Sequence, residues 1–340
     1  MDILKSTLSI SRYWFLNPQS INALRMSCTP LNAGQAWSPI DDLPFTKSIG
    51  LVDVKNYEKP ADAVEILGEF LFFRIRLDVK KVPAAVLNRR VEQALAQERV
   101  ETGGGVSRAR TKEIKESVRS RMEQAAEPVP HTVMVATDGR EILVTTTTSW
   151  ILEEVEVTLW SLFQDRPFVP ANLCTLESWN DRERVHGWPL HAQRMGSEFL
   201  TSLYRNEGAG GLDTGQLEVH SAVQVDAPMG AERIQVAADG RSEWPEVSLA
   251  LSDGQKMISK AGLLYSHEEK DFELKLNSDW SVQSLRMPIQ DALSSARSGE
   301  VGSGILIAIS LVQEVLHAID QYALQAVENR EVQPPLESAA

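Results

Sequence analysis

The chain has 340 residues, 43% of them hydrophobic and 24% charged, a composition typical of globular proteins with room for two or three packed units. Its two cysteines, Cys28 and Cys174, lie far apart and belong to no ligand motif, so neither a disulfide framework nor a zinc ribbon is expected. A signal peptide and a membrane span are not expected either, because no uninterrupted apolar run approaches the roughly 20 residues that a span needs. We therefore expect a cytoplasmic protein.

Residues 1–82 are predicted to form the β-rich N-terminal part of a central α+β domain. Alternating segments near Leu8 and from Ile49 to Val54 indicate strands. The run GEFLFFRIRLDV is rich enough in aromatic and β-branched residues for a central strand. We expect a sheet here with one helix packed on it.

Residues 83–130 predict a pair of helices. Pro83 suits the start of the first helix, whose apolar stripe is Leu87, Val91, Ala94 and Leu95. Glycines 103–105 end that helix, and Ser107 is a suitable N-cap for a second one that runs to about residue 126. The second stripe, Ile114, Val118 and Met122, can cover one neighbouring helix but not a domain core. The segment therefore predicts a projecting helical hairpin with arms of roughly 27 Å.

This predicted hairpin gathers positive charge in an acidic protein. Between residues 80 and 121 there are eleven Lys or Arg against five Glu, a local charge of +6 in a chain whose net charge is −13, so the remaining residues carry −19. Such polarisation favours a surface that binds a polyanion, with nucleic acid the first candidate. The alternative is a solvated helix pair whose charges serve only solubility.

The cations of the second helix recur at a helical spacing. Arg108, Lys112, Lys115 and Arg119 follow one another at four, three and four residues, which places them on one face. Lys and Arg spaced along a surface displace the counterions of a nucleic-acid backbone and need no base-reading Asn or Gln. The pattern therefore favours binding without sequence preference.

The rest of the chain predicts further α+β structure. Residues 131–212 read as the remainder of the central domain, with a β-hairpin around the turn DGR and an amphipathic helix at residues 150–163. Residues 213–328 predict a mostly antiparallel layer from the alternating segments VHSAVQV, RIQVAA, VSLALS and DFELKL. A buried helix from Ile305 is predicted to pack on that layer, and residues 329–340 form a polar tail.

Several blocks resemble the RdgC family of recombination-associated DNA-binding proteins. In order, they are FTKSIGLVDV, LFFRIRLDVKKVPAAVL, SRARTKEIKESVRSRM, PVPHTVMVATDGREILV and LFQDRPFVP. Two later blocks, GSEFLTSLYRNEGAGG and DFELKLNSDWSVQSLRMP, look like the longer, more divergent branch of that family. The blocks are scattered over most of the chain, and none of them is a catalytic signature.

The resemblance implies an α+β fold, a head-to-head dimer closed into a ring, and sequence-independent binding of duplex DNA. It also implies that the helical hairpins act as fingers that meet across the ring, and that the protein restrains RecA-type recombinase by occupying DNA. Carried over to this sequence, the likeness marks eight phosphate contacts on the finger: Arg89, Arg90, Arg108, Arg110, Lys112, Lys115, Arg119 and Arg121.

An enzymatic alternative is a Mg²⁺-dependent nuclease. Such a site needs a carboxylate followed by Glu-x-Lys on a strand, which Asp271, Glu273 and Lys275 supply, with Pro245 and Glu246 upstream. The simpler interpretation is an amphipathic strand in which these three side chains face solvent while Phe272, Leu274 and Leu276 face the core.

Other candidate sites are weaker. His186 and His191, with Asp181 and Glu183 nearby, could bind a metal, but the proline between the histidines favours a loop. No glycine motif for a nucleotide and no GxSxG elbow occurs, so no cofactor is predicted. Most of the eight tryptophans, including Trp150, Trp160 and Trp280, are expected in the core, whereas Trp179 and Trp188 lie in polar sequence where a base could stack.

The sequence therefore predicts a non-enzymatic, nucleoid-associated protein of α+β class that binds double-stranded DNA as a homodimer and opposes a RecA-type recombinase. The alternatives are the nuclease and an acidic module that mimics DNA in order to bind another protein.

Overall fold

The fold is that of a computed structural model, which describes residues 7–28, 35–41, 43–61, 64–177, 189–205, 209–212, 215–227, 233–239, 244–252, 254–297 and 301–329. The chain divides into two compact units that interleave along the sequence. Unit 1 comprises residues 1–28, 64–72 and 134–340, and unit 2 comprises residues 29–63 and 73–133. The predicted α+β class is confirmed, because helices and antiparallel strands both contribute heavily.

The first group of strands in unit 1 surrounds β1 (Leu8–Phe15). It pairs with β13 (Val282–Arg286), β6 (Glu141–Val144) and β7 (Phe168–Pro170), and β6 continues to the end of β5 (Pro128–Thr137). The predicted β-hairpin around DGR is the β5–β6 pair. The predicted amphipathic helix is α4 (Ser149–Phe163), which buries Val155, Leu159 and Leu162 completely. Short α1 (Ile21–Ser27) and β3 (Glu65–Leu67) also belong to this unit.

The second group of strands in unit 1 is antiparallel, as predicted. Its order is β10 (Arg233–Asp239), β9 (Gly215–Asp226), β11 (Met257–His267), β12 (Lys270–Asn277) and β13, with β8 (Ala209–Leu212) paired to β9. Helices α5 (Leu173–Glu177), α6 (Pro189–Arg205), α8 (Gln290–Arg297) and α9 (Val301–Glu328) complete the unit. Gly196 of α6 approaches Ser278 so closely that a Cβ would lie 2.1 Å from its carbonyl oxygen.

One predicted strand is wrong. VSLALS forms helix α7 (Pro245–Leu251), in which Pro245 occupies the first turn. Val247, Ala250 and Leu251 are buried, which is the spacing of one helical face. In so short a segment the same apolar residues fit both the alternation of a strand and the spacing of a helix. The proline favours the helix, because it suits the first helical turn.

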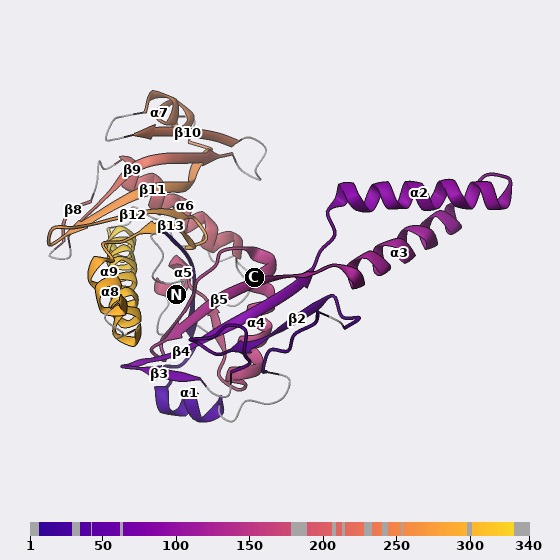
Figure 1. The fold of residues 1–340 in the computed structure, drawn as a ribbon. Coiled ribbons are helices and arrows are strands. Elements are labelled where there is room, and N and C mark those ends of the chain that lie inside the picture. The colour runs from indigo at the N-terminus through magenta and orange to yellow at the C-terminus, as the bar shows by residue number, and fades with distance from the viewer. Residues whose placement is uncertain are drawn as a thin grey trace, which may run out of the picture. The chain divides into compact units, whose positions relative to one another are not determined.

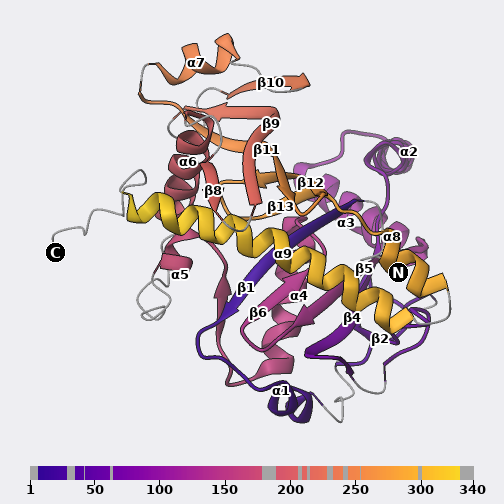
Figure 2. The same ribbon diagram turned by 90° about the vertical axis from the view of Figure 1, so that its left-hand side faces the viewer.

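Helix α9 is the predicted C-terminal helix. Ile309, Val315 and Leu316 are fully buried, and α9 contacts α5, α6, α8 and β9 (Figure 2). Among the described residues it is the one helix whose length and apolar composition would suffice to cross a membrane, and more than half of its most apolar stretch is buried in the fold.

Unit 2 holds strand β2 (Lys47–Val52) antiparallel to β4 (Phe70–Lys80), followed by helices α2 (Ala84–Thr102) and α3 (Arg108–Ala125). Gly103 ends α2 in the left-handed conformation, at φ 63°, as the glycine run predicts. Ser107 caps α3, its hydroxyl accepting a hydrogen bond from the Arg110 N–H. Figure 1 shows the two helices side by side, reaching away from β2 and β4 of the same unit.

Lys80 anchors the base of this helix pair. Its side chain is buried, and its ammonium donates to three carbonyl oxygens, those of Asp41, Leu43 and Gln124, at 2.9–3.0 Å. Gln124 belongs to the last turn of α3, where carbonyl groups lack helical partners and favour a cation. Lys80 therefore fixes the end of α3 to the segment that precedes β2.

Replacing Lys80 with Met should keep the buried volume but leave three carbonyl groups without their donor. We expect the free energy of unfolding to fall by about 2 kcal/mol, measured by urea denaturation. The matched control is Lys59→Met, an exposed lysine of the same unit, which should change stability by less than about 0.5 kcal/mol. Equal effects of the two variants would contradict the anchoring role.

Candidate functional site

The hairpin of α2 and α3, residues 84–125, is held by a narrow apolar seam. Only Val91 and Ile114 are buried in the two helices, at 8% and 9% exposure. Leu87, Ala94 and Val118 are half-buried beside them, while Val100 is 83% exposed. Because the seam takes up so little of each helix, most of the hairpin surface remains in contact with water.

Arg110 forms a clamp across the seam. Its Nε and Nη2 donate to the two carboxylate oxygens of Glu98 at 2.8 and 3.3 Å, and its Nη1 donates to Glu113 at 3.1 Å. The hydrogen bonds from Arg110 lower the pKa of Glu98. This arginine is among the predicted phosphate contacts, but in the structure its donors are engaged by two carboxylates.

The predicted face of α3 is present and exposed. At 100° per residue, Arg108, Lys112, Lys115 and Arg119 fall within an arc of about 60°, and all four side chains are exposed. We call these four residues the cation face. Lys112 and Arg119 make long i,i+4 ion pairs with Glu116 and Glu123, at 3.8 and 3.6 Å. Arg108 and Lys115 have no ion-pair partner in the described part of the chain.

The remaining predicted residues lie elsewhere on the hairpin. Arg89 and Arg90 are exposed on α2, where Arg90 contacts Gln93 at 3.3 Å. Arg121 lines a groove of about 330 Å³ together with Arg110 and three carboxylates, those of Glu98, Glu101 and Glu113. The structure thus brings four of the eight predicted residues into one cationic surface, and it places Arg110 and Arg121 on a face of mixed charge.

Arg99 of α2 is a further exposed cation on the hairpin, which the sequence pattern did not single out as a contact. A second groove, of about 230 Å³, is lined by Leu87, Asn88 and Val91 of α2 and by Lys115, Glu116 and Arg119 of α3. Asn88 therefore lies on the same side of the hairpin as the cation face. Arg99 is eleven residues, about three turns, after Asn88 and shares its flank of α2. Arg99 is exposed. The helical spacing within α2 alone does not identify it, because its place on the hairpin depends on how α2 and α3 pair.

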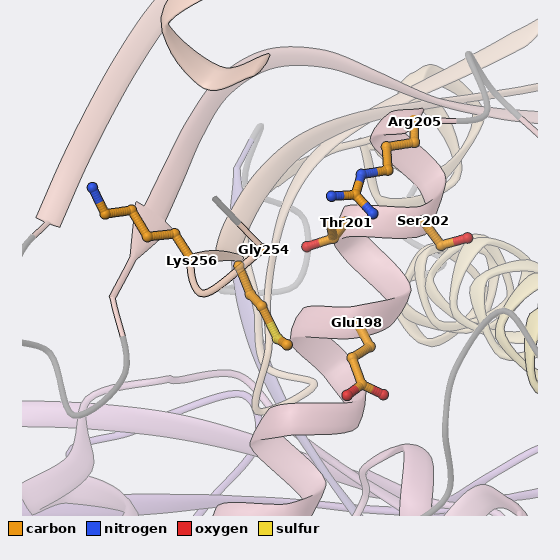
Figure 3. Close-up of a pocket in the computed structure, with 7 residues that line it drawn as sticks. Glu198, Thr201, Ser202, Arg205, Gly254 and Lys256 are labelled. Carbon is orange, nitrogen blue, oxygen red and sulfur yellow. The ribbon is translucent and has the colours of Figure 1, made fainter. Parts of the chain in front are cut away.

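A cavity of about 280 Å³ lies in unit 1 between α6 and the turn before β11 (Figure 3). Its lining residues are Glu198, Thr201, Ser202, Arg205, Gly254, Lys256 and Met257. Several polar groups here are already engaged within the fold. Thr201 donates to the Ser197 carbonyl and accepts from the Ile258 N–H, and Glu198 pairs with Arg194 at 2.9 Å.

The segment that suggested a nuclease is the amphipathic strand β12. Phe272, Leu274 and Leu276 are buried, as the alternation predicts. Glu273 pairs with Arg286 at 2.9 Å, and Asp271 accepts a hydrogen bond from Ser266 at 2.6 Å. Lys275 lies opposite Gly262 and Gln283 on the neighbouring strands. The carboxylates are thus engaged by protein groups on the solvent side of the sheet.

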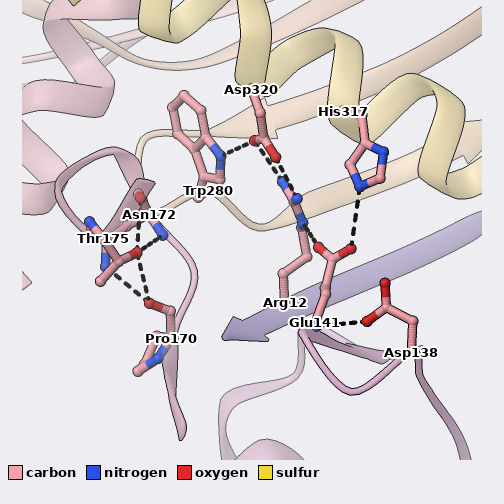
Figure 4. Close-up of polar contacts among 9 residues, drawn as sticks. All are labelled: Arg12, Asp138, Glu141, Pro170, Asn172, Thr175, Trp280, His317 and Asp320. Atoms are coloured by element: carbon pink, nitrogen blue, oxygen red, sulfur yellow. Dashed lines mark hydrogen bonds and ion pairs between the residues drawn. The ribbon is translucent and has the colours of Figure 1, made fainter. Parts of the chain in front are cut away.

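A buried ionic cluster ties β1, β6 and α9 together in unit 1 (Figure 4). Arg12 donates from Nε to Glu141 and, through both terminal nitrogens, to Asp320 at 2.9 and 2.6 Å. Trp280 donates its Nε1–H to the same Asp320, at 3.0 Å. The second oxygen of Glu141 is buried and accepts no hydrogen bond from the described residues, and the half-exposed His317 lies 3.9 Å from it.

The remaining sequence candidates have mixed outcomes. Asp181, Glu183, His186, Trp179 and Trp188 lie outside the described residues, and so does the side chain of His191. Within the described ranges, no three His, Cys, Asp or Glu residues converge as metal ligands. Trp280 is buried as predicted, whereas Trp160 is 44% exposed and Trp150 is half-buried. Trp160 stacks on Phe168, with ring centroids 4.6 Å apart, so one face of its ring is already covered.

The buried cluster predicts a pH effect on stability. Burial raises the pKa of Glu141 in the folded protein, so its contribution is fully present below about pH 4.5 and is lost as the pH rises through the folded pKa. Glu141→Gln keeps an oxygen for Arg12 and does not titrate. Wild-type stability should therefore fall relative to this variant, by up to about 1.4 kcal/mol per pH unit in that window. Urea denaturation of both proteins from below pH 4.5 up to pH 8 measures the difference, and a constant difference across that whole range would contradict the assignment.

No protein-family model matches the sequence, and no curated protein matches it.

Proposed function

We propose that the protein binds double-stranded DNA without sequence preference and that the cation face of the hairpin is its principal contact. The observation that supports this most is the exposure of four cations within one arc of α3, two of which have no carboxylate partner among the residues that the structure describes. The face carries only Arg and Lys, the side chains that contact phosphates. Within the arc of α3 that holds these four cations there is no Asn or Gln, the side chains suited to reading adenine, although Asn88 of α2 lies beside it.

The dimensions of the face suit a nucleic-acid backbone. From Arg108 to Arg119 the helix rises about 16 Å, at 1.5 Å per residue. A DNA strand presents one phosphate per roughly 3.4 Å of axis, so the face spans about five phosphates. The remainder of the chain carries a charge of −19 outside residues 80–121, which disfavours DNA contacts over most of its surface and makes the hairpin the principal cationic surface.

The resemblance to the RdgC family adds a biological role to the proposal. It supports a homodimeric ring around the duplex, with the hairpins as fingers, and antagonism of a RecA-type recombinase by occupation of its DNA. Sequence-neutral binding is what such antagonism requires, because a recombinase also coats DNA of any sequence. The protein would act on the nucleoid without a cofactor.

Reversing the cation face tests the proposal. The quadruple variant Arg108→Glu, Lys112→Glu, Lys115→Glu, Arg119→Glu should abolish binding to a 30-base-pair duplex, because it replaces four phosphate contacts with four repulsions. All four positions are exposed and Glu is a good helix former, so the helix should persist. Fluorescence anisotropy measures binding, and circular dichroism with gel filtration checks fold and assembly. Unchanged affinity in a folded variant would remove the hairpin from the interface.

A matched pair of neutral variants separates the cation face from the Arg110 clamp. Lys115→Gln should lower the slope of log K against log salt by about 0.9, the value for one lost phosphate contact. Arg110→Gln removes the same charge, but the native side chain is held by Glu98 and Glu113, so the slope should change much less. Equal changes in slope would mean that DNA displaces the carboxylates and recruits Arg110.

A further inference from the structure

Two lysines share the solvent face of the sheet in unit 1. Lys260 of β11 lies opposite Asn277, and Lys275 of β12 lies opposite Gly262, so the lysines are diagonal neighbours. The residues between and beyond them on these strands, Ala261, Leu263, Leu274 and Leu276, are buried on the other face. Both lysine side chains therefore stand on the side of the sheet that faces away from the core.

A third polar group completes the cluster. Gln283 of β13 lies opposite Lys275, and its side-chain oxygen accepts a hydrogen bond from the Lys260 ammonium. Lys260 and Lys275 are half-buried, and burial together with the nearby Lys275 charge lowers the pKa of Lys260. Two like charges are thus held close together in a partly dehydrated place.

Three carboxylates near the two lysines are engaged by other groups. Glu273 pairs with Arg286 at 2.9 Å, and Asp226 pairs with Arg233 at 3.1 Å. Asp279 is the carboxylate whose charge acts on Lys260, but it accepts hydrogen bonds from the backbone and hydroxyl of Ser281. Neither lysine has an ion-pair partner among the residues that the structure describes. An anion seated between the two ammonium groups would relieve their repulsion.

We propose that Lys260, Lys275 and Gln283 form a phosphate-binding site on the solvent face of the sheet in unit 1, separate from the hairpin. Two ammonium groups donate several charge-assisted hydrogen bonds to the oxygens of one phosphate group, and the Gln283 amide adds a neutral donor. The identification of the phosphate as part of duplex DNA rests on the proposed function. A small phosphate-bearing ligand has the same chemistry.

Residue-resolved acylation of the full-length protein tests the site. Acetic anhydride modifies neutral amines, and mass spectrometry reads the rate at each lysine. A 30-base-pair duplex at ten times its dissociation constant should slow the modification of Lys260 and Lys275 about tenfold. Lys270, which is paired with Glu314, serves as the control and should stay unaffected. Lys112 and Lys115 report separately on the hairpin, so failure of the proposed function is seen independently.

A second arm replaces the duplex with inorganic phosphate at constant ionic strength. Protection by phosphate but not by DNA would overturn the nucleic-acid source and assign a small phosphate-bearing ligand. Protection of Lys112 and Lys115 alone, in both arms, would overturn the site while leaving the proposed function intact. Protection of Lys260 and Lys275 without the hairpin lysines would support the site and contradict the hairpin as the principal contact.

The salt dependence of the affinity for duplex DNA tests the site independently. Lys260→Gln with Lys275→Gln should lower the salt slope for duplex binding by about 1.8, the value for two phosphate contacts. The charge-matched control is Arg194→Gln with Lys270→Gln, two residues that are ion-paired in the native fold and lie off this face. An equal change of slope in both double variants would mean that only net charge matters, and it would overturn the site.

Discussion

The narrow seam between α2 and α3 is the constraint on which the hairpin depends. Only Val91 and Ile114 are buried there, so the two helices gain little from each other and rely on additional contacts. Arg110 joins the helices through Glu98, and Lys80 holds the end of α3 to the rest of unit 2. A broader apolar stripe would bind the helices more firmly, but it would take the surface on which the cations lie. Stability of the hairpin and exposure of its charge are therefore opposed, and the fold resolves this with a few polar contacts at its edges.

In unit 1, one cluster of charged side chains is buried rather than exposed. Arg12, Glu141 and Asp320 are buried together, where each charge has lost its water and the loss of one partner is therefore costly. The cluster connects the first strand to the last helix, so it specifies the fold rather than an interface. The hairpin cations stay in water, where each is worth little to stability but remains available to a partner. The same kinds of side chain thus serve packing in unit 1 and, under the proposed function, recognition in unit 2, and burial distinguishes the two roles.

Much of this arrangement follows from local patterns in the sequence. The helices of the hairpin, their glycine and serine boundaries, the β5–β6 hairpin and helix α4 all carry strong periodic or capping signals. The periodic signal is weak in short elements such as α1, β3 and α7, because a few residues fit more than one period. The clamp at Arg110 and the position of Arg99 depend on how two helices face each other, which the spacing within one helix does not contain. The Lys260–Lys275 cluster likewise requires the pairing of β11, β12 and β13, which are distant from the basic segment and individually unremarkable in charge.

The central claim is that the hairpin surface binds duplex DNA by electrostatic contact alone. The most direct test is the affinity of the wild-type protein for unrelated 30-base-pair duplexes across a salt series from 50 to 200 mM, with Mg²⁺ present and the DNA examined afterwards for cleavage. With at least four phosphate contacts, the affinity should fall at least about 10²-fold over this range, equally for every sequence, and the DNA should remain intact. Absence of binding at 50 mM salt would contradict the claim, and cleavage would direct attention to Asp271, Glu273 and Lys275 instead.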